Sequence, residues 1–70
     1  MLNPGDLVRS TTPLYFGNTK RKKGLLALVV RVGPRDMAFP NVLDMDVIVD
    51  DHRYSVHTLR GYWEVANAAR

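Results

Sequence analysis

The chain has no cysteine, so it can form neither a disulfide nor a thiolate metal site. It also has no long apolar segment, and no basic stretch with an apolar one behind it follows Met1, so we expect no signal peptide and no membrane anchor. At 70 residues it lies near the lower limit for unaided folding, because so small a chain buries only about 60% of its unfolded surface. We therefore expect one domain, residues 1–70, that is not secreted and is stabilised by packing and by partner subunits.

Charge is distributed unevenly along the chain, whose net charge is +3. From Arg9 to Arg35 there are seven basic residues and no acidic one, and from Asp36 to Asp51 there are five aspartates and no basic residue. A uniform basic stripe would favour nucleic acid. Adjoining basic and acidic regions suit docking to another protein or to copies of the same chain instead. The charge pattern therefore favours a protein partner.

The longest apolar run, residues 24–32 (GLLALVVRV), is rich in β-branched side chains and predicts a central strand. Because successive side chains of a strand point to opposite faces, we assign its even positions to the core and its odd ones to the outer face. Several apolar neighbours on an outer face favour an intermolecular contact, unless residues 14–16 cover them. The core set is Leu26, Leu28, Val30 and Val32, and the outer apolar set is Leu25, Ala27, Val29 and, from the next strand, Ile48.

The most regular alternation lies in Val42–Asp50, where apolar side chains alternate with aspartates. Aspartate and β-branched residues both disfavour helices, so this segment predicts a half-buried strand. Asp50–His52 then predicts a tight hairpin turn, whose type stays open because the usual Gly or Asn is missing. The inward set is Leu43, Met45, Val47 and Val49, and the outward set is Asp44, Asp46, Ile48 and Asp50.

Shorter segments complete the expected domain. Residues 11–23 show no helical period and predict a long first loop, in which residues 14–16 can fold back over the core. Residues 33–41 predict a second loop that opens with a turn at 33–36, and residues 67–70 a tail. The remaining strands are Leu7–Ser10, Arg53–His57 with Tyr54 and Val56 inward, and Tyr62–Ala66 with Trp63 and Val65 inward, the last preceded by one helical turn at Thr58–Gly61.

Five short strands, a long first loop and a single turn before the last strand are typical of an SH3-like barrel. Residues 4–9 (PGDLVR), 30–33 (VRVG), 54–57 (YSVH) and 59–65 (LRGYWEV) together resemble the small SH3-like barrel proteins of tailed bacteriophages, especially those of cyanobacteria. The resemblance covers nearly the whole chain. It implies an all-β, five-stranded SH3-like barrel with one 3-10 turn before the last strand, and a place in a virion assembled in the host cytoplasm. KOW-type barrels are also similar, but a much longer loop replaces their glycine-centred one here.

A basic run, Lys20 to Lys23, is the strongest local charge signal. Its four cations could neutralise about four phosphates, and the nearby Tyr15 and Phe16 could stack on bases. The same run could meet an acidic protein or lie in solvent. The sequence leaves these three interpretations open.

Two groups of residues could be arranged as a metal site or as a catalytic triad, and we expect neither to function. Asp44, Asp46 and Asp50 share a strand face, but a flat strand spreads such carboxylates about 6 to 7 Å apart, so we expect no metal and no cofactor. Ser55, His57 and Asp46 could be arranged as a triad, yet a triad also needs an oxyanion hole and a substrate cleft. We therefore expect a protein that is not an enzyme.

Three functional hypotheses follow. The first is a non-catalytic structural or interaction module, a small virion protein of the capsid surface, neck or tail that docks on other virion subunits or on copies of itself. The second is a KOW-like nucleic-acid-binding barrel that uses Lys20 to Lys23 and Tyr15, and the third is a phage-encoded inhibitor of a host protein. For the first, the expected contact residues are Leu25, Ala27, Val29, Ile48, Tyr62, Lys20, Arg21, Lys22, Lys23, Asp44 and Asp46.

Overall fold

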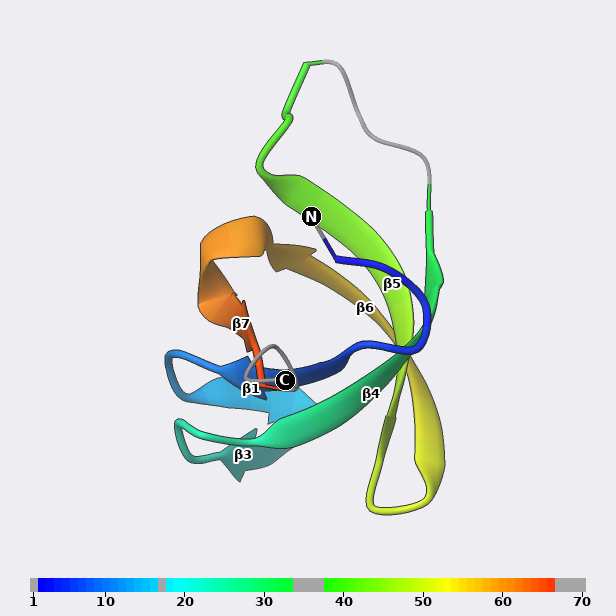
Figure 1. Cartoon of the computed structure of the whole chain (residues 1–70). Coiled ribbons are helices and arrows are strands. Elements are labelled where there is room, and N and C mark those ends of the chain that lie inside the picture. The colour runs from blue at the N-terminus through cyan, green and yellow to red at the C-terminus, as the bar shows by residue number, and fades with distance from the viewer. Residues whose placement is uncertain (1, 17, 34–37, 67–70) are drawn as a thin grey trace.

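The fold is all-β, and five of its strands form one antiparallel sheet (Figure 1). The computed structural model describes residues 2–16, 18–33 and 38–66, so the expected turn at 33–36 and the tail at 67–70 fall largely or wholly outside the described residues. The five main strands expected from the sequence are confirmed. The elements are β1 (Leu7–Ser10), β2 (Leu14–Phe16), β3 (Thr19–Arg21), β4 (Leu26–Val32), β5 (Val42–Val49), β6 (His52–Leu59), the 3-10 turn η1 (Arg60–Tyr62) and β7 (Trp63–Val65).

The main sheet has two edges. Its strand order is β6-β5-β4-β1-β7, and within the described ranges β6 pairs only with β5 and β7 only with β1. The sheet is therefore not closed into a hydrogen-bonded barrel. The turn η1 joins the edge strand β6 to the opposite edge strand β7, across the core (Figure 1).

The hydrophobic core lies on one face of the sheet. The inward set of β5 is confirmed for Met45, Val47 and Val49, which are buried, and Leu43 packs against them half-buried. Trp63 is also buried, as expected, and Val65, Tyr54 and Val56 pack against the core. The other buried apolar residues come from β1, β4, the β2–β3 hairpin and the N-terminal segment: Val8, Ala27, Val29, Phe16 and Leu2.

The assignment of faces in β4 was wrong for its first half. Ala27 and Val29 are buried, whereas Leu26 and Leu28 are exposed. Pairing with β1 sets this phase, because Ala27 lies opposite buried Val8 and Leu26 lies opposite exposed Arg9. A β-bulge between Val29 and Arg31 then shifts the register by one residue. After the bulge, Val32 packs against the core as expected.

This correction can be tested by two substitutions at neighbouring positions. Leu28→Lys keeps its side chain in solvent and should change the free energy of unfolding by no more than about 0.5 kcal/mol. Val29→Ala removes buried methyl groups and should lower it by about 2 kcal/mol. Urea denaturation of both variants gives the two values. The reverse order of effects would restore the original assignment.

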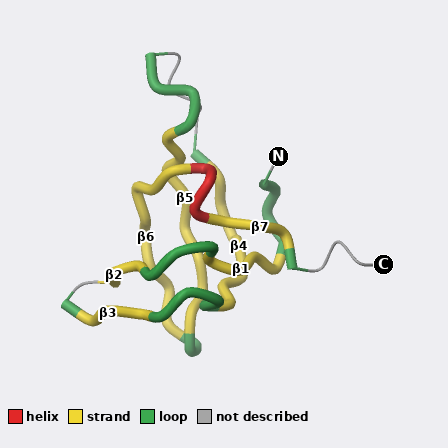
Figure 2. Tube along the Cα trace, turned by 90° about the vertical axis from the view of Figure 1, so that its left-hand side faces the viewer, coloured by secondary structure: helices red, strands yellow, loops and turns green. Residues whose placement is uncertain are grey.

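The long first loop contains a two-stranded hairpin that was not expected. Within the described part of the chain, strands β2 and β3 pair with each other and with no strand of the main sheet, and Figure 2 shows them as a separate arm beside it. The Phe16 ring packs edge-on against the Tyr54 ring, with centroids 5.2 Å apart. Arg21 Nη2 donates to Asp50 Oδ2 at 2.7 Å. An aromatic contact and an ion pair therefore hold the arm against the β5–β6 hairpin.

The turn between β5 and β6 has two residues, both with left-handed backbone. Asp50 has φ 51° and Asp51 has φ 67°, the combination of a type I′ turn. This conformation matches the twist of the flanking strands and fixes Val49 opposite His52. Aspartate adopts it more readily than most residues, but at an energetic cost that glycine does not have.

We expect Asp51→Gly to raise the free energy of unfolding by about 1 kcal/mol, because glycine removes the strain of a left-handed side chain. Asp51→Ala should lower it, since alanine lacks aspartate's tolerance of this conformation. Asp50 is left unchanged because it holds Arg21. Thermal unfolding measures both variants, and a stabilising alanine would contradict the turn assignment.

Candidate functional site

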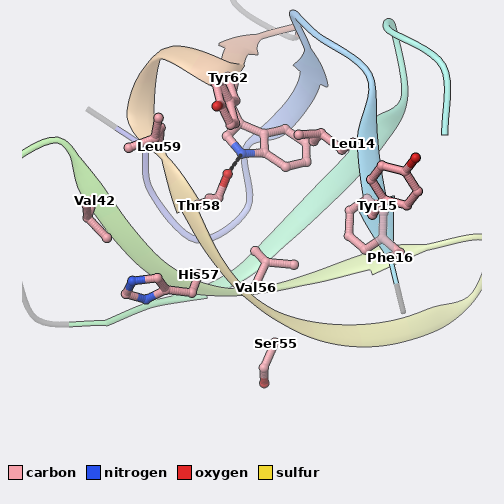
Figure 3. Close-up of a pocket in the computed structure, with 11 residues that line it drawn as sticks. Leu14, Tyr15, Phe16, Val42, Ser55, Val56, His57, Thr58, Leu59 and Tyr62 are labelled. Atoms are coloured by element: carbon pink, nitrogen blue, oxygen red, sulfur yellow. Dashed lines mark hydrogen bonds between the residues drawn. The ribbon is translucent and has the colours of Figure 1, made fainter. Parts of the chain in front are cut away.

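A groove of about 380 Å³ lies between the hairpin arm and the edge strand β6 (Figure 3). Strand β2 forms one side of it and β6 the other. The turn η1 and the start of β7 close one end. Its lining residues are Leu14, Tyr15, Phe16, Val42, Ser55, Val56, His57, Thr58, Leu59, Tyr62 and Trp63.

The floor of the groove is fixed by buried Trp63. Its indole Nε1 donates to Thr58 Oγ1 at 3.1 Å, which satisfies the one polar atom of a buried tryptophan. Arg60 Nη1 also donates to the Trp63 carbonyl at 2.8 Å, so η1 is tied to the start of β7. Phe16 and Val56 line the groove together with Trp63. This part of the site is apolar and preformed.

The rim of the groove is aromatic and aliphatic but exposed. Tyr15 is 70% exposed, Leu59 41% and Tyr62 38%. These three come from three different elements: the arm, the end of β6 and η1. Tyr62 was expected to face outward, and it does. Large side chains that converge on one groove and remain in solvent are typical of a surface that a partner covers.

The basic run does not act as one unit. Lys20 pairs across the arm with Tyr15, and Lys20, Lys22 and Lys23 are exposed and form no ion pair with any other described residue. Arg21 differs, because its guanidinium binds Asp50 at 2.7 Å and holds the arm in place. Three of the four cations are thus free for a partner, and the fourth has a structural role.

Asp46 was expected to be an exposed contact residue, but it is only 7% exposed. Its carboxylate accepts hydrogen bonds from Arg31 at 3.2 Å, Arg53 at 2.8 Å and Ser55 at 2.9 Å. These donors, Arg31 first, hold the pKa of Asp46 well below its usual range. They join β4, β5 and β6 on the outer face, so Asp46 stabilises the sheet there. Asp44, by contrast, is exposed and lies 2.7 Å from His57 Nδ1.

This network predicts a loss of stability in acid. Because the pKa of Asp46 is lower in the folded chain, its charge stabilises the fold above the carboxyl pKa of the unfolded chain, about 3.9, and the contribution is lost as pH falls further. We expect Asp46→Asn to lower Tm at neutral pH and to show a smaller fall in Tm than the wild type on acidification from about pH 6 to about pH 2. Circular dichroism gives both values. Asp44→Asn is the control, and an equal fall in Asp46→Asn and wild type would contradict the role of Asp46.

The residues of the hypothetical triad are not arranged as one. Ser55 Oγ donates to Asp46, whereas the His57 ring contacts Asp44. Figure 3 shows the Ser55 side chain pointing away from Tyr15. Nor do any three or more histidine, aspartate or glutamate side chains in the described ranges come close enough to hold a metal ion.

The expected outer patch was wrong for the residues of β4, whereas Ile48 of β5 lies half-buried on the outer face as expected. Ala27 and Val29 are core residues and cannot contact a partner, and Leu25 is half-buried against the core. The exposed apolar residues of β4 are instead Leu26 and Leu28. A cross-strand row, Leu7–Leu28–Ile48, crosses β1, β4 and β5 on the outer face.

The sequence did not reveal the groove, because its two sides come from segments about forty residues apart that meet only in the fold. One local signal was available in β6. The strand was expected to end at His57, yet the alternation of inward and outward side chains continues in the sequence to Leu59, which is exposed in the structure. For β4, a charge on β1 marked the outer face, since Arg9 must lie in solvent and its cross-strand neighbour shares that face.

Comparisons with known proteins identified no relative of this chain. A scan against protein-family models, a search of curated proteins and a search of solved structures each found no match to the chain. In the described part of the chain, no helix has the length and apolar character needed to cross a membrane.

Proposed function

We propose that the chain is a non-catalytic interaction module that docks on another protein through the groove between β2 and β6. The observation that carries this proposal is the exposure of Tyr15, Leu59 and Tyr62 around one preformed apolar floor. Tyrosine is enriched at the centres of protein interfaces, because it buries a large area at a low cost in side-chain entropy. Lys20 lies across the arm from the rim residue Tyr15 and forms no ion pair with any other described residue, which favours a partner with an acidic surface.

The proposed architecture is the SH3-like barrel, left open at one side. Three features support it: five main strands, an arm inserted between the first two of them, and a 3-10 turn directly before the last. The phage-like sequence patterns extend the proposal to a small virion protein of the capsid surface, neck or tail, assembled in the host cytoplasm. An inhibitor of a host protein would use the same groove, so the identity of the bound protein separates the two roles.

One alternative is supported by a specific contact. Lys20 lies directly across the arm from Tyr15, and Lys22 and Lys23 follow on the same strand-to-loop segment. A stacking ring beside free cations is the arrangement that single-stranded nucleic acids bind. This alternative requires only the arm, whereas the protein-docking proposal requires the groove floor and η1 as well.

The two proposals can be separated by variants of the full chain. We expect Tyr62→Ala to reduce co-sedimentation with assembled phage particles by at least about tenfold, as for a central interface tyrosine. Tyr62→Phe, which keeps the ring, should bind almost as well as the wild type. Mass spectrometry of the pelleted particles gives the bound amounts.

Several outcomes would contradict docking through the groove. A wild-type chain that is monomeric and absent from particles would remove the virion role. A loss of binding in Leu28→Lys but not in Tyr62→Ala would move the contact to the outer face. DNA binding that falls steeply with salt, and that disappears when the three free lysines become alanine, would support the nucleic-acid alternative.

A further inference from the structure

Strand β6 presents an unpaired backbone edge. Its hairpin partner β5 is joined to it by a two-residue turn, so the flanking residues Val49 and His52 exchange both backbone hydrogen bonds. Along the ladder between β5 and β6, every second residue pair from Val49 and His52 also exchanges both backbone hydrogen bonds. The N–H and C=O groups of the intervening residues point away from β5, and these residues are Arg53, Ser55, His57 and Leu59.

No described residue satisfies this edge. β6 has β5 as its one strand partner in the described ranges, and no backbone hydrogen bond outside that ladder involves Ser55, His57 or Leu59. An unpaired edge is a template on which another extended chain can add as a strand. The other edge strand, β7, is only 3 residues long and offers a much shorter template.

The groove runs along this edge. It is lined by five consecutive residues of β6, Ser55 to Leu59, although alternate side chains of a strand point to opposite faces. The Ser55 and His57 side chains are engaged on the outer face by Asp46 and Asp44. What these two residues bring to the groove is therefore their backbone edge, while Val56 supplies the floor (Figure 3).

The dimensions suit one added strand. Five residues of β6 extend over about 16 Å, the length of a short strand. The contact between Phe16 and Tyr54 closes the groove at the end nearest the β5–β6 turn, and η1 lies at the other. Across from β6, Leu14 and Tyr15 supply a second apolar side for the inward side chains of an inserted segment.

We propose that the groove binds an extended segment of another protein as a strand added to β6, and that this segment alternates apolar and acidic residues. The inference rests on the proposed function, because it requires a protein partner. Inward apolar side chains would pack against Val56 and Trp63, and outward acidic ones would lie beside the exposed guanidinium of Arg53. The Asp46 carboxylate is shared by two arginines, Arg31 and Arg53, so this cluster beside β6 keeps a net positive charge.

The probe is a synthetic peptide of about eight residues that alternates valine and glutamate, titrated into the full-length chain. The single tryptophan, Trp63, forms the groove floor, so its fluorescence reports occupancy directly. We expect binding, and we expect N-methylation of the peptide bonds that face β6 to weaken it at least about tenfold, because it removes the donors of the added ladder. A peptide that alternates valine and lysine should also bind at least about tenfold more weakly.

A matched pair of protein variants tests the edge itself. His57→Pro removes a backbone N–H that points away from β5, and an edge strand tolerates proline at such a position. The substitution should weaken peptide binding at least about tenfold. His57→Ala keeps the N–H and should stay within about twofold of the wild type. Should His57→Pro fail to fold, the N-methylated peptide on the wild-type chain decides the question alone.

Four results would overturn strand addition to a partner. Two concern the designed peptides: equal binding of the N-methylated peptide, or no binding of the valine–glutamate peptide. The third is stronger binding of a proline-rich peptide, whose prolines lack N–H donors. The fourth is a concentration-dependent dimer that His57→Pro abolishes, because a second copy of the chain would then be the occupant. Co-sedimentation separates these from failure of the proposed function. If Tyr62→Ala reduces docking but His57→Pro does not, the proposed function stands and strand addition fails. If neither variant reduces docking, the groove is not the docking site.

Discussion

The position of β4 between β1 and β5 is the constraint on which the rest of the structure depends. Val8 packs opposite Ala27, and Val29 opposite Val47, so one face of three strands closes into a dry core. The bulge after Val29 allows β4 to keep apolar residues inward on both sides of it and turns Arg31 toward Asp46. The inward position of Val32 and the contact between Arg31 and Asp46 thus both depend on one irregularity in one strand.

The sequence predicted those elements in which only one arrangement buries the apolar side chains. In β5 the aspartates mark the outer face, so the inward set was assigned correctly. In β4 both faces are apolar before Arg31, and the alternation alone could not choose between them. The choice depends on pairing with Arg9 and on a bulge, neither of which leaves a mark within the strand's own residues.

The candidate site was less predictable than the fold, because contacts between distant segments create it. The arm takes its position from Phe16 on Tyr54 and Arg21 on Asp50, two pairs that a pass along the chain cannot join. Tyr62 was identified from its expected outward position in the last strand, and the cationic run from its composition. The groove between them and the unpaired edge of β6 became visible only with the strand order.

Pairing between β1 and β7 joins the first and the last strand of the main sheet. Val8 lies opposite Val65, and the Ala66 N–H donates to the Leu7 carbonyl at 2.7 Å. This edge is the one farthest from β6 in the strand order. Because the two strands lie near opposite ends of the sequence, their pairing closes the longest loop of the sheet and carries the largest cost in chain entropy. The β5–β6 hairpin, which supplies one side of the groove, needs only a two-residue turn, so its strands can pair at a much lower entropic cost.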